Sequence, residues 1–404
     1  MVSRSAPLNI LFLMSDVGGG HRAAAKAIAG AFHQLYGDRV NTIIADLMAD
    51  YLPWPLTGIR RTYTPMVQYM HPVYGAIWHL GTRRPVTKAL LKALDVLFGP
   101  GVQRCYARYR PDAVISVHPL MVRTPCRLLR QMGFTAPFVT VVTDLVSMFP
   151  TWFYPEVDAC IVPTPAAAQA AYEFGLARER VHVLGQPIDV RFREYLRTYA
   201  LTNDRSAARA KLGLRPELPT ILLVSGGDGV GPVEEVAAAI DAQPLTAQLV
   251  IICGRNAALR RRLSQRPWHL PVRVEGFVED MPAWMAASDC IVTKAGPGTI
   301  AEAMAMGLPI LLFSYILGQE EGNITYVVEN GLGVYTPQPS AIAATLADWL
   351  AGDQETLLRM RRQCQRLARP NAALDIARTV IHSVERKTWS VERATRPARP
   401  TFHA

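Results

Sequence analysis

The sequence predicts an α/β protein of two domains, each built on a parallel sheet. Three observations support this prediction. The length of 404 residues exceeds the usual core of one domain, half of the residues are apolar, and short apolar runs alternate with glycine-rich turns and helical stretches. Only 19% of the residues are charged, so two buried cores and a fairly apolar surface are both expected.

Two series of apolar runs mark the expected strands. The first comprises residues 9–15, 40–45, 113–117, 138–142 and 159–162, and the second comprises residues 220–225, 249–253, 272–275, 290–293 and 310–313. Residues 189–219 between the two series are polar and lack β periodicity, so we place the boundary near residue 195. The expected units are an N-terminal domain (1–195), a C-terminal domain (196–386) that ends in helices, and a basic, disordered tail (387–404).

The net charge of +10 is unevenly distributed. Residues 51–110 contain nine Arg and Lys against one acid, Asp95, and Tyr and Trp residues are interleaved with the cations. This composition favours a lipid headgroup interface, although a helical hairpin packed by its own aromatics would show it too. No nucleic-acid motif occurs, so anionic lipid is the expected partner. The candidate surface contacts are Trp54, Trp78, Arg83 and Arg84.

The six cysteines stand far apart without a C-x-x-C pair, which favours a reducing compartment over a disulfide framework or a zinc site. The apolar run at residues 8–14 is too short to span a bilayer, and we interpret it as a buried strand. We therefore expect a peripheral protein on the cytoplasmic face of a membrane.

A glycine turn follows the first expected strand. Gly18, Gly19 and Gly20 precede His21 and an alanine-rich helix. Glycines let a ligand approach the backbone, and the helix start offers N–H groups and a positive dipole end to an anion. The same dipole disfavours imidazolium, so His21 should be neutral and able to accept a proton. An incidental exposed histidine in a tight turn would have the same sequence.

The C-terminal domain opens in the same way. Gly226 and Gly227 follow its first strand and are compatible with phosphate, but the loop is not a G-x-x-x-x-G-K-[ST] P-loop. Arg255 follows the next strand, where it could donate to the same phosphates or lie on the surface. Phe277 and Val278 follow a third strand, where their backbone could bond the edge of a base.

The most informative segment runs from Lys294 to Glu302. The backbone at Gly296 and Gly298, together with the Thr299 hydroxyl, could hold a diphosphate without a metal. Glu302 either completes a capping box with Thr299 or bonds the hydroxyls of a ribose. Its position one turn into the helix favours the ribose.

A polar loop lies further along the chain. Gln319, Glu320 and Asn323 follow the strand at 310–313, and amide and carboxylate groups there could bond sugar hydroxyls. An ordinary solvated loop with a helix cap is the alternative.

These segments in this order closely resemble the monogalactosyldiacylglycerol synthases and related bacterial diacylglycerol glucosyltransferases, and also the peptidoglycan lipid-intermediate N-acetylglucosaminyltransferase. The similarity covers residues 10–334. The segments that match are SDVGGGHRAAAKAI (15–28), HPLM (118–121), TVVTDL with PTWF (140–153), CGRN (253–256), GFVEDMPAWMAASDCIVTKAGPGTIAEA (276–303) and GQEEGNITYVVENGLGV (318–334).

The resemblance implies a GT-B fold, in which two Rossmann-like, doubly wound domains face each other across a cleft, and inverting transfer from a UDP-hexose to diacylglycerol. His21 matches the proposed catalytic base, Glu302 the ribose-binding glutamate, and Gln319 with Glu320 the sugar-binding pair. Lys294, Gly296, Gly298 and Thr299 match the donor phosphate loop. Asp144, the second candidate catalytic residue, and Trp152 match an acceptor-side stretch. Gly19 and Gly20, beside the base, are candidate acceptor contacts. Phe149 and Tyr154 depart from the plant-type synthases, which usually carry histidines there.

The closeness of GPGTIAEA and GQEEGN to the plant-type synthases favours galactose as the sugar. No D-x-D triplet occurs, so we expect transfer that needs no metal and no cofactor besides the UDP-sugar donor. Alternatives are a UDP-glucose-dependent diacylglycerol glucosyltransferase, N-acetylglucosaminyl transfer to a lipid-linked acceptor, a UDP-sugar epimerase and a non-catalytic lipid-surface binder.

Overall fold

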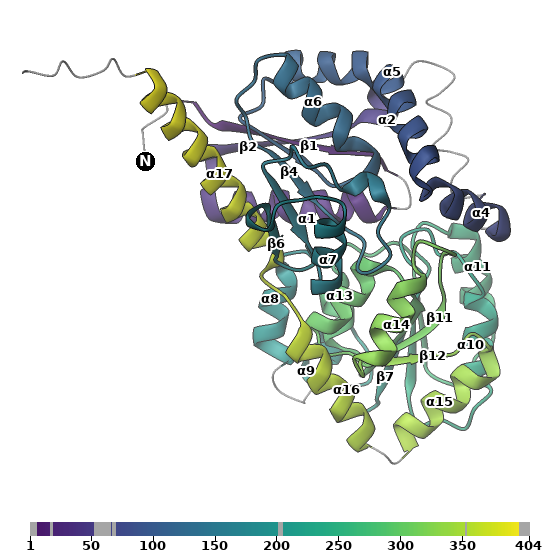
Figure 1. Ribbon diagram of the computed structural model, residues 1–404. Coiled ribbons are helices and arrows are strands. Elements are labelled where there is room, and N and C mark those ends of the chain that lie inside the picture. The colour runs from purple at the N-terminus through teal and green to yellow at the C-terminus, as the bar shows by residue number, and fades with distance from the viewer. Residues whose placement is uncertain are drawn as a thin grey trace, which may run out of the picture.

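The structure is a computed structural model that describes residues 6–16, 19–51, 66, 70–200, 205–351 and 354–395. Two parallel six-stranded sheets, each with helices on both faces, form the two halves of the molecule (Figure 1). The predicted α/β class with two doubly wound domains is confirmed. Of the predicted membrane contacts, Trp54 and the side chain of Arg84 lie outside the described residues.

The N-terminal sheet has the strand order β2-β1-β3-β4-β5-β6. Its strands are β1 (Leu8–Met14), β2 (Val40–Asp46), β3 (Ala113–Ser116), β4 (Phe138–Val141), β5 (Ala159–Val162) and β6 (Val181–Val183). The order reverses between β1 and β3, which opens a crevice at their carboxyl ends. The helices of this half are α1 (Gly20–Tyr36), α2 (Leu47–Asp50), α4 (His71–Gly81), α5 (Arg84–Tyr109), α6 (Arg123–Gln131) and α7 (Pro165–Glu173).

The C-terminal sheet has the order β12-β11-β10-β7-β8-β9, which reverses between β7 and β10. Its strands are β7 (Thr220–Val224), β8 (Gln248–Ile252), β9 (Val272–Glu275), β10 (Cys290–Lys294), β11 (Ile310–Ser314) and β12 (Gly333–Tyr335). The helices are α8 (Arg191–Tyr195) at the junction, α9 (Ser206–Lys211), α10 (Val233–Asp241), α11 (Ala257–Gln265), α12 (Met281–Ala286), α13 (Pro297–Ala305), α14 (Glu321–Glu329), α15 (Pro339–Ala351) and α16 (Gln354–Leu367). All ten expected strands are present, and the edge strands β6 and β12 are additional.

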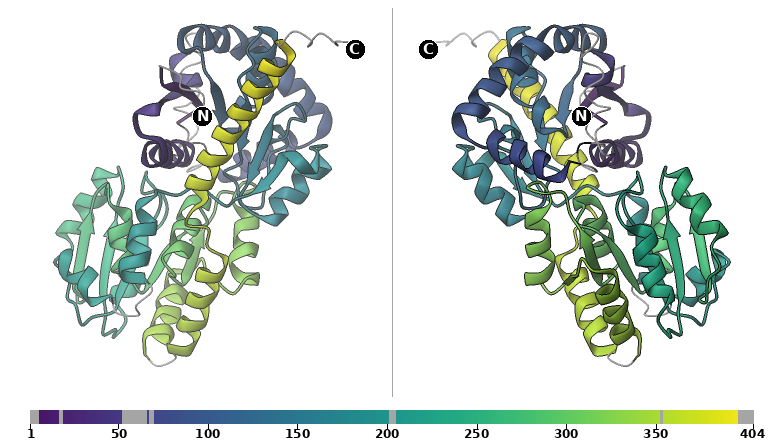
Figure 2. Two further views of the ribbon diagram at one scale, coloured as in Figure 1. Left: turned by 90° about the vertical axis from the view of Figure 1, so that its left-hand side faces the viewer. Right: turned by 90° about the vertical axis from the view of Figure 1, so that its right-hand side faces the viewer.

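The last helix corrects the predicted domain limits. Helix α17 (Ala372–Thr395) runs back from the C-terminal half to the N-terminal half, where it packs beside α1 (Figure 2). Its apolar residues join the buried cluster around Ile10 and Phe12. Both faces of the C-terminal sheet are already covered by other helices, so the apolar stripe of α17 is buried on the first sheet instead.

The predicted start of a disordered tail at residue 387 is also wrong, because α17 continues to Thr395. Lys387 lies within this helix and pairs with Asp158 over 2.6 Å. Residues 396–404 lie outside the described part of the chain.

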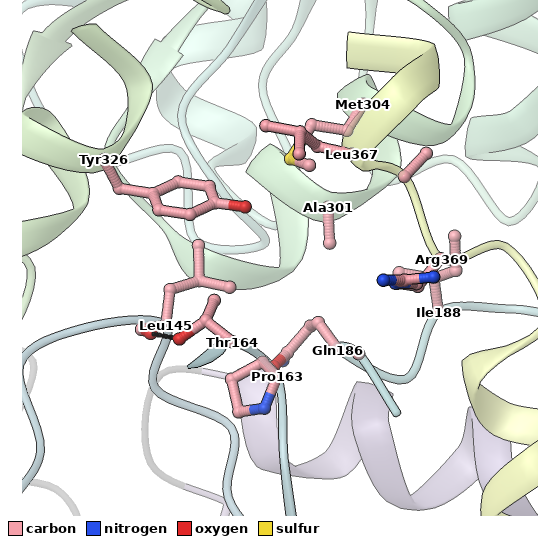
Figure 3. Close-up of a pocket in the computed structure, with 12 residues that line it drawn as sticks. Leu145, Pro163, Thr164, Gln186, Ile188, Ala301, Met304, Tyr326, Leu367 and Arg369 are labelled. Carbon is pink, nitrogen blue, oxygen red and sulfur yellow. Dashed lines mark hydrogen bonds between the residues drawn. The ribbon is translucent and has the colours of Figure 1, made fainter. Parts of the chain in front are cut away.

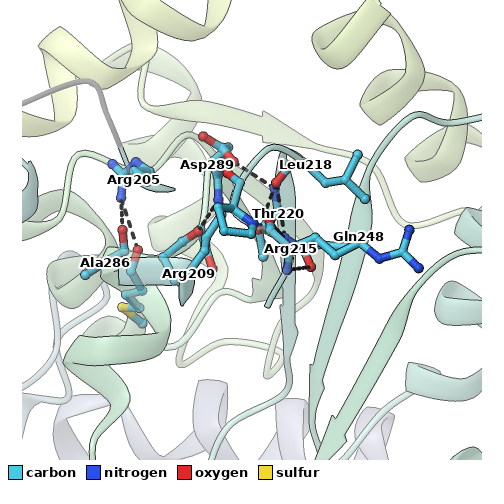
Figure 4. Close-up of polar contacts among 12 residues, drawn as sticks. Arg205, Arg209, Arg215, Leu218, Thr220, Gln248, Ala286 and Asp289 are labelled. Atoms are coloured by element: carbon cyan, nitrogen blue, oxygen red, sulfur yellow. Dashed lines mark hydrogen bonds and ion pairs between the residues drawn. The ribbon is translucent and has the colours of Figure 1, made fainter. Parts of the chain in front are cut away.

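Two buried arginines connect the segment between the domains to the C-terminal domain (Figure 4). Arg205 is 2% exposed and donates to the backbone carbonyls of Met285, Ala286 and Met306. Burial lowers the pKa of Arg205 to about 9. Arg209, on α9, pairs with Asp289, the residue before β10. The segment that leads from one domain to the other is therefore held by hydrogen bonds inside the protein.

A small cavity lies between the domains near α13 (Figure 3). Its volume is about 30 Å³, room for on the order of two water molecules. Gln186 and Thr164 line it from the N-terminal half, and Ala301 and Tyr326 line it from the C-terminal half. The Gln186 Oε1 atom is buried without a protein partner in the described structure, which suits a bridging water.

Candidate functional site

His21 lies in the first turn of α1, at the crevice between β1 and β3. Gly19 precedes the helix as its N-cap with φ of 77°, a left-handed conformation that glycine adopts without strain. The His21 Nδ1 atom is 3.2 Å from Thr143 Oγ1, and the centroid of the His21 ring lies 6.2 Å from that of the Trp152 indole ring. The turn thus directs the imidazole toward the ends of β3 and β4.

The His21 ring is neutral at physiological pH. Burial lowers the pKa of His21 to about 4, while a hydrogen bond with the Val117 backbone and the charge of Asp16 oppose the shift. A neutral ring agrees with the sequence-based expectation. Its main cause is burial, whereas we expected the helix dipole to keep the ring neutral.

A second histidine packs against the first. The His118 ring lies 4.5 Å from that of His21, and its Nδ1 accepts a hydrogen bond from the Leu120 N–H. Burial and the neighbouring His21 hold the pKa of His118 well below its ordinary value. The sequence placed His118 in a matching motif but gave it no role. Its position directly after β3, beside β1, was the available signal.

Asp144 connects the two domains. It follows β4, is 5% exposed, and accepts a hydrogen bond from Trp152 Nε1 over 2.6 Å. Gln319 of the C-terminal domain bonds the same carboxyl group. Burial raises the pKa of Asp144 to about 7, and nearby Glu320 adds to the shift, while the two hydrogen bonds oppose it.

The predicted phosphate loops meet at the C-terminal switch point, because β7, β8 and β10 are adjacent. A Cβ on Gly226 would lie 3.4 Å from Lys294 Cε, and one on Gly227 would lie 3.3 Å from Arg255 Nη2. The side chains of Lys294 and Arg255 therefore lie beside glycine backbone that no side chain covers. A Cβ on Gly19 would also lie 3.4 Å from Arg255 Nη2, so the first turn of the N-terminal domain faces these loops across the interface.

Both cations have acidic partners. Arg255 donates to the Asp228 carboxylate through Nε and Nη2, and its guanidinium lies 5.6 Å from the Phe277 ring. Lys294 pairs with Glu320, which is 3% exposed and also accepts from the Ile316 N–H. Both carboxylate oxygens of Glu320 thus have protein partners, and its direct structural role is to hold Lys294.

Helix α13 begins at Pro297 with Gly296 as its N-cap, and no side chain caps it. Thr299 is therefore the third helical residue, and the capping-box alternative for Glu302 is wrong. A Cβ on Gly298 would meet no atom within 4 Å, so space is open beside the first turn. The helix presents N–H groups to that space.

The Glu302 carboxyl group has no hydrogen-bond or cationic partner among the described residues. Burial raises the pKa of Glu302 to about 8, and the charge of Asp189 adds to the shift. Without a structural partner, this group is available to a ligand with hydroxyl donors.

The remaining predicted residues differ in their surroundings. Asn323 is 1% exposed, and its Nδ2 donates to the Ala295 carbonyl, so it braces the turn before α13. Phe277 is 59% exposed beside Arg255, while Val278 packs against the C-terminal core. Gly20 has open space around its Cα. No group of three or more His, Cys, Asp or Glu in the described ranges is arranged to hold a metal ion.

In the region expected to bind the membrane, aliphatic side chains are more exposed than the aromatic residue Trp78. Trp78 packs against Phe149, with ring centroids 5.0 Å apart. The outer side of α4, together with the N-cap residue Met70, carries a stripe of apolar side chains at helical spacing, each between 43 and 51% exposed, which was not predicted from the sequence: Met70, Val73, Ile77 and Leu80. Exposed cations follow in the chain, at Arg83 before α5 and at Lys88 and Lys92 on α5. Within the described ranges, no helix is long and apolar enough to cross a bilayer.

Comparison with known proteins defines the class. Residues 21–188 match the family model of monogalactosyldiacylglycerol (MGDG) synthase, and residues 220–376 match that of the glycosyltransferase family 28 C-terminal domain. The fold and the paired crevices are those of a GT-B glycosyltransferase, as predicted. MurG of Acinetobacter baumannii has the same fold, with a TM-score of 0.58 at 15% identity over 93% of this chain and 100% of that one. So does the UDP-GlcNAc 2-epimerase of Neisseria meningitidis, with a TM-score of 0.58 at 14% identity over the same shares.

Two plant proteins are more similar in sequence. The monogalactosyldiacylglycerol synthase of Spinacia oleracea is 40% identical over 398 residues, which are 96% of this chain and 75% of that protein. Monogalactosyldiacylglycerol synthase 1 of Arabidopsis thaliana is 40% identical over 399 residues, 96% of this chain and 73% of that protein. The chain belongs to the monogalactosyldiacylglycerol synthase family, and the predicted resemblance is confirmed.

Proposed function

We propose that this enzyme transfers a galactosyl group from UDP-galactose to the free hydroxyl group of diacylglycerol, with inversion at the anomeric carbon. Membership of the MGDG synthase family supports the reaction and both substrates. The observation that carries the mechanism is the approach of the first turn of α1, which bears His21, to Arg255 and the phosphate loops of the other domain.

The reaction needs a base on one wall of the cleft and positive charge on the other. His21 takes the proton of the acceptor hydroxyl, the hydroxyl oxygen bonds to the anomeric carbon, and the bond from that carbon to the diphosphate oxygen breaks. UDP leaves with the bonding electrons. The pKa of His21 is about 4 without substrate, and the negative charge of the leaving diphosphate raises the affinity of the ring for a proton during transfer.

The C-terminal domain holds the donor. Lys294, Arg255 and the N–H groups at Gly298 and Thr299 stabilise the diphosphate, so no metal ion is required. Glu302 bonds the ribose, because its half-buried carboxyl group has no partner among the described residues. Gly226 and Gly227 allow the diphosphate to approach the end of β7, and the backbone at Phe277 and Val278 contacts the uracil.

The sugar and the acceptor occupy the middle of the cleft. Gln319 bonds the hexose directly, while Glu320 acts mainly by positioning Lys294. Asn323 supports the turn at Gly296 from behind. On the acceptor side, Asp144 and Trp152 form the wall beside His21, and Gly19 and Gly20 leave space for the glycerol.

The enzyme binds the bilayer from one side, through the stripe on α4 and the cations that follow it in the chain. Apolar side chains insert at the headgroup level, while Arg and Lys attract anionic lipid. We propose the cytoplasmic face as the location, because all six cysteines are buried and unpaired.

One competition experiment tests the reaction. The purified chain is supplied with equimolar UDP-galactose and UDP-glucose and with vesicles of phosphatidylcholine, phosphatidylglycerol and diacylglycerol, in EDTA. We expect galactosyldiacylglycerol as the main product. A glucosyl product, transfer to a polyprenyl-linked acceptor alone, or conversion of the UDP-sugar without lipid would each contradict the proposal. The last outcome matters because an epimerase shares the fold.

A further inference from the structure

We propose that Tyr74 is a positioning residue for the donor sugar, and that through it helix α4 couples binding of the lipid surface to binding of UDP-galactose. This inference rests on the proposed function, because it assumes that Gln319 contacts the hexose. It adds a residue of the other domain to the sugar site and predicts a dependence of donor affinity on lipid.

Tyr74 is a buried residue at the domain interface. It lies on α4, is 8% exposed, and its hydroxyl donates to Gln319 Oε1 over 2.8 Å. The Gln319 side chain also bonds Asp144. Two residues of the N-terminal domain therefore hold one amide group of the C-terminal domain. Because Oε1 accepts from Tyr74, the amide nitrogen is turned toward Asp144, and the orientation of the group is set.

The backbone around Gln319 packs against helix α4, which carries Tyr74. A Cβ on Gly318 would lie 2.5 Å from Trp78 Cδ1, and one on Gly75 would lie 2.3 Å from Leu317 Cδ2. Glycine at both positions thus permits the close approach of helix and loop. At the far end of the loop, the Gly322 N–H donates to Ser147 Oγ over 3.0 Å. A shift of α4 must therefore shift the loop that carries Gln319.

The other side of α4 faces outward and carries the apolar stripe of Met70, Val73, Ile77 and Leu80. One helix thus contacts the donor loop with one side and exposes apolar groups with the other, and it lies where the two halves meet (Figure 1). A bilayer that binds the stripe stabilises the position of α4 in which Tyr74 reaches Gln319. Coupling of this kind is reciprocal, so UDP-galactose must strengthen vesicle binding by the factor by which vesicles strengthen UDP-galactose binding.

The test uses Tyr74→Phe in the full chain, which keeps the ring and removes the hydroxyl donor. Calorimetry measures the dissociation constants of UDP-galactose and UDP, with and without phosphatidylcholine–phosphatidylglycerol vesicles that lack diacylglycerol. We expect the constant for UDP-galactose to rise about threefold to tenfold and that for UDP to stay unchanged, since the lost bond orients only the sugar contact. We also expect the effect of vesicles on UDP-galactose binding to disappear.

Two variants serve as controls. Tyr106→Phe removes another buried tyrosine hydroxyl, which donates to the Pro125 carbonyl away from the cleft, and should leave both nucleotide affinities unchanged. Ile77→Ser should weaken vesicle binding and leave the affinity for UDP-galactose without vesicles unchanged. If Tyr74→Phe weakens the binding of UDP and of UDP-galactose equally, or weakens the binding of neither, the positioning role is overturned. If the sugar-dependent loss is seen but no galactose is ever transferred, the reaction fails and the positioning role stands.

Discussion

Trp152 donates its indole N–H to the Asp144 carboxylate over 2.6 Å, at the point where the two domains meet. Burial raises the pKa of Asp144 to about 7 despite this bond. The charge on Asp144 therefore changes near neutral pH, and with it the strength with which the carboxyl group holds Trp152 on its own domain and Gln319 on the other.

Asp144→Asn should flatten the dependence of stability on pH. The pKa of Asp144 in the folded protein lies above that of a carboxyl in the unfolded chain, about 4. The unfolded chain loses its proton first as pH rises, so this group lowers the free energy of unfolding between about pH 4 and pH 7, by on the order of a few kcal/mol. Urea unfolding across this window measures the change. The exposed control Asp38→Asn should keep the slope of the parent chain, and an equal slope in Asp144→Asn would contradict the assignment.

His21→Ala should lower kcat by roughly 10²- to 10⁴-fold, because the acceptor hydroxyl loses its base. The affinity for UDP-galactose, measured by calorimetry, should stay within about twofold, since His21 lies on the acceptor wall and does not hold the donor. The matched control is His33→Ala, which removes an exposed histidine further along α1. A kcat in His21→Ala equal to that of the control would exclude His21 as the base.

Glu302→Ala should weaken UDP binding by about 10- to 100-fold, the loss expected for two hydrogen bonds to the ribose. The preference for UDP over 2′-deoxy-UDP should disappear as well, because the ribose hydroxyls lose their acceptor. Competition calorimetry with both nucleotides measures this. Glu329→Ala, an exposed change on α14, should retain the preference of the parent chain. Retention of that preference in Glu302→Ala would place the ribose elsewhere.

Arg205→Met should cost about 3–5 kcal/mol of unfolding free energy, because three backbone carbonyls lose their buried donor. Arg215 is exposed, so Arg215→Ala should stay within about 0.5 kcal/mol of the parent. Urea denaturation followed by circular dichroism compares the two. A loss in Arg205→Met as small as that of the control would show that the junction is held by other contacts.

The sequence predicted most of the framework because ten of the strands are apolar runs of four to seven residues that turns and helical stretches separate. The edge strands β6 and β12 were missed because each has three residues, too few to show a pattern, and part of β6 is exposed. The sequence could predict that the candidate donor loops lie together, because glycines and cations follow strands that become neighbours at the switch point. Tyr74 could not be recognised, because its role depends on a contact with a residue 245 positions away.

The amphipathic pattern of residues 372–384 predicts a helix but does not say which sheet it covers. Likewise, the apolar residues at 70, 73, 77 and 80 are interleaved with aromatic residues, so only the structure separates the outer side of α4 from the side that packs on the protein. In both cases the sequence predicts the helix, but the surface against which the helix packs depends on tertiary contacts.

Helix α17 has a consequence for how the molecule is made. The first sheet begins at Leu8, yet the helix that completes the cover beside α1 begins only at Ala372 and is therefore translated much later. A nascent chain therefore keeps the apolar groups around Ile10 and Phe12 incompletely covered until residues 372–384 have left the ribosome. During this interval a chaperone that binds apolar surface has a defined target, and a helix from a second nascent chain could take the place of α17 and produce a domain-swapped pair.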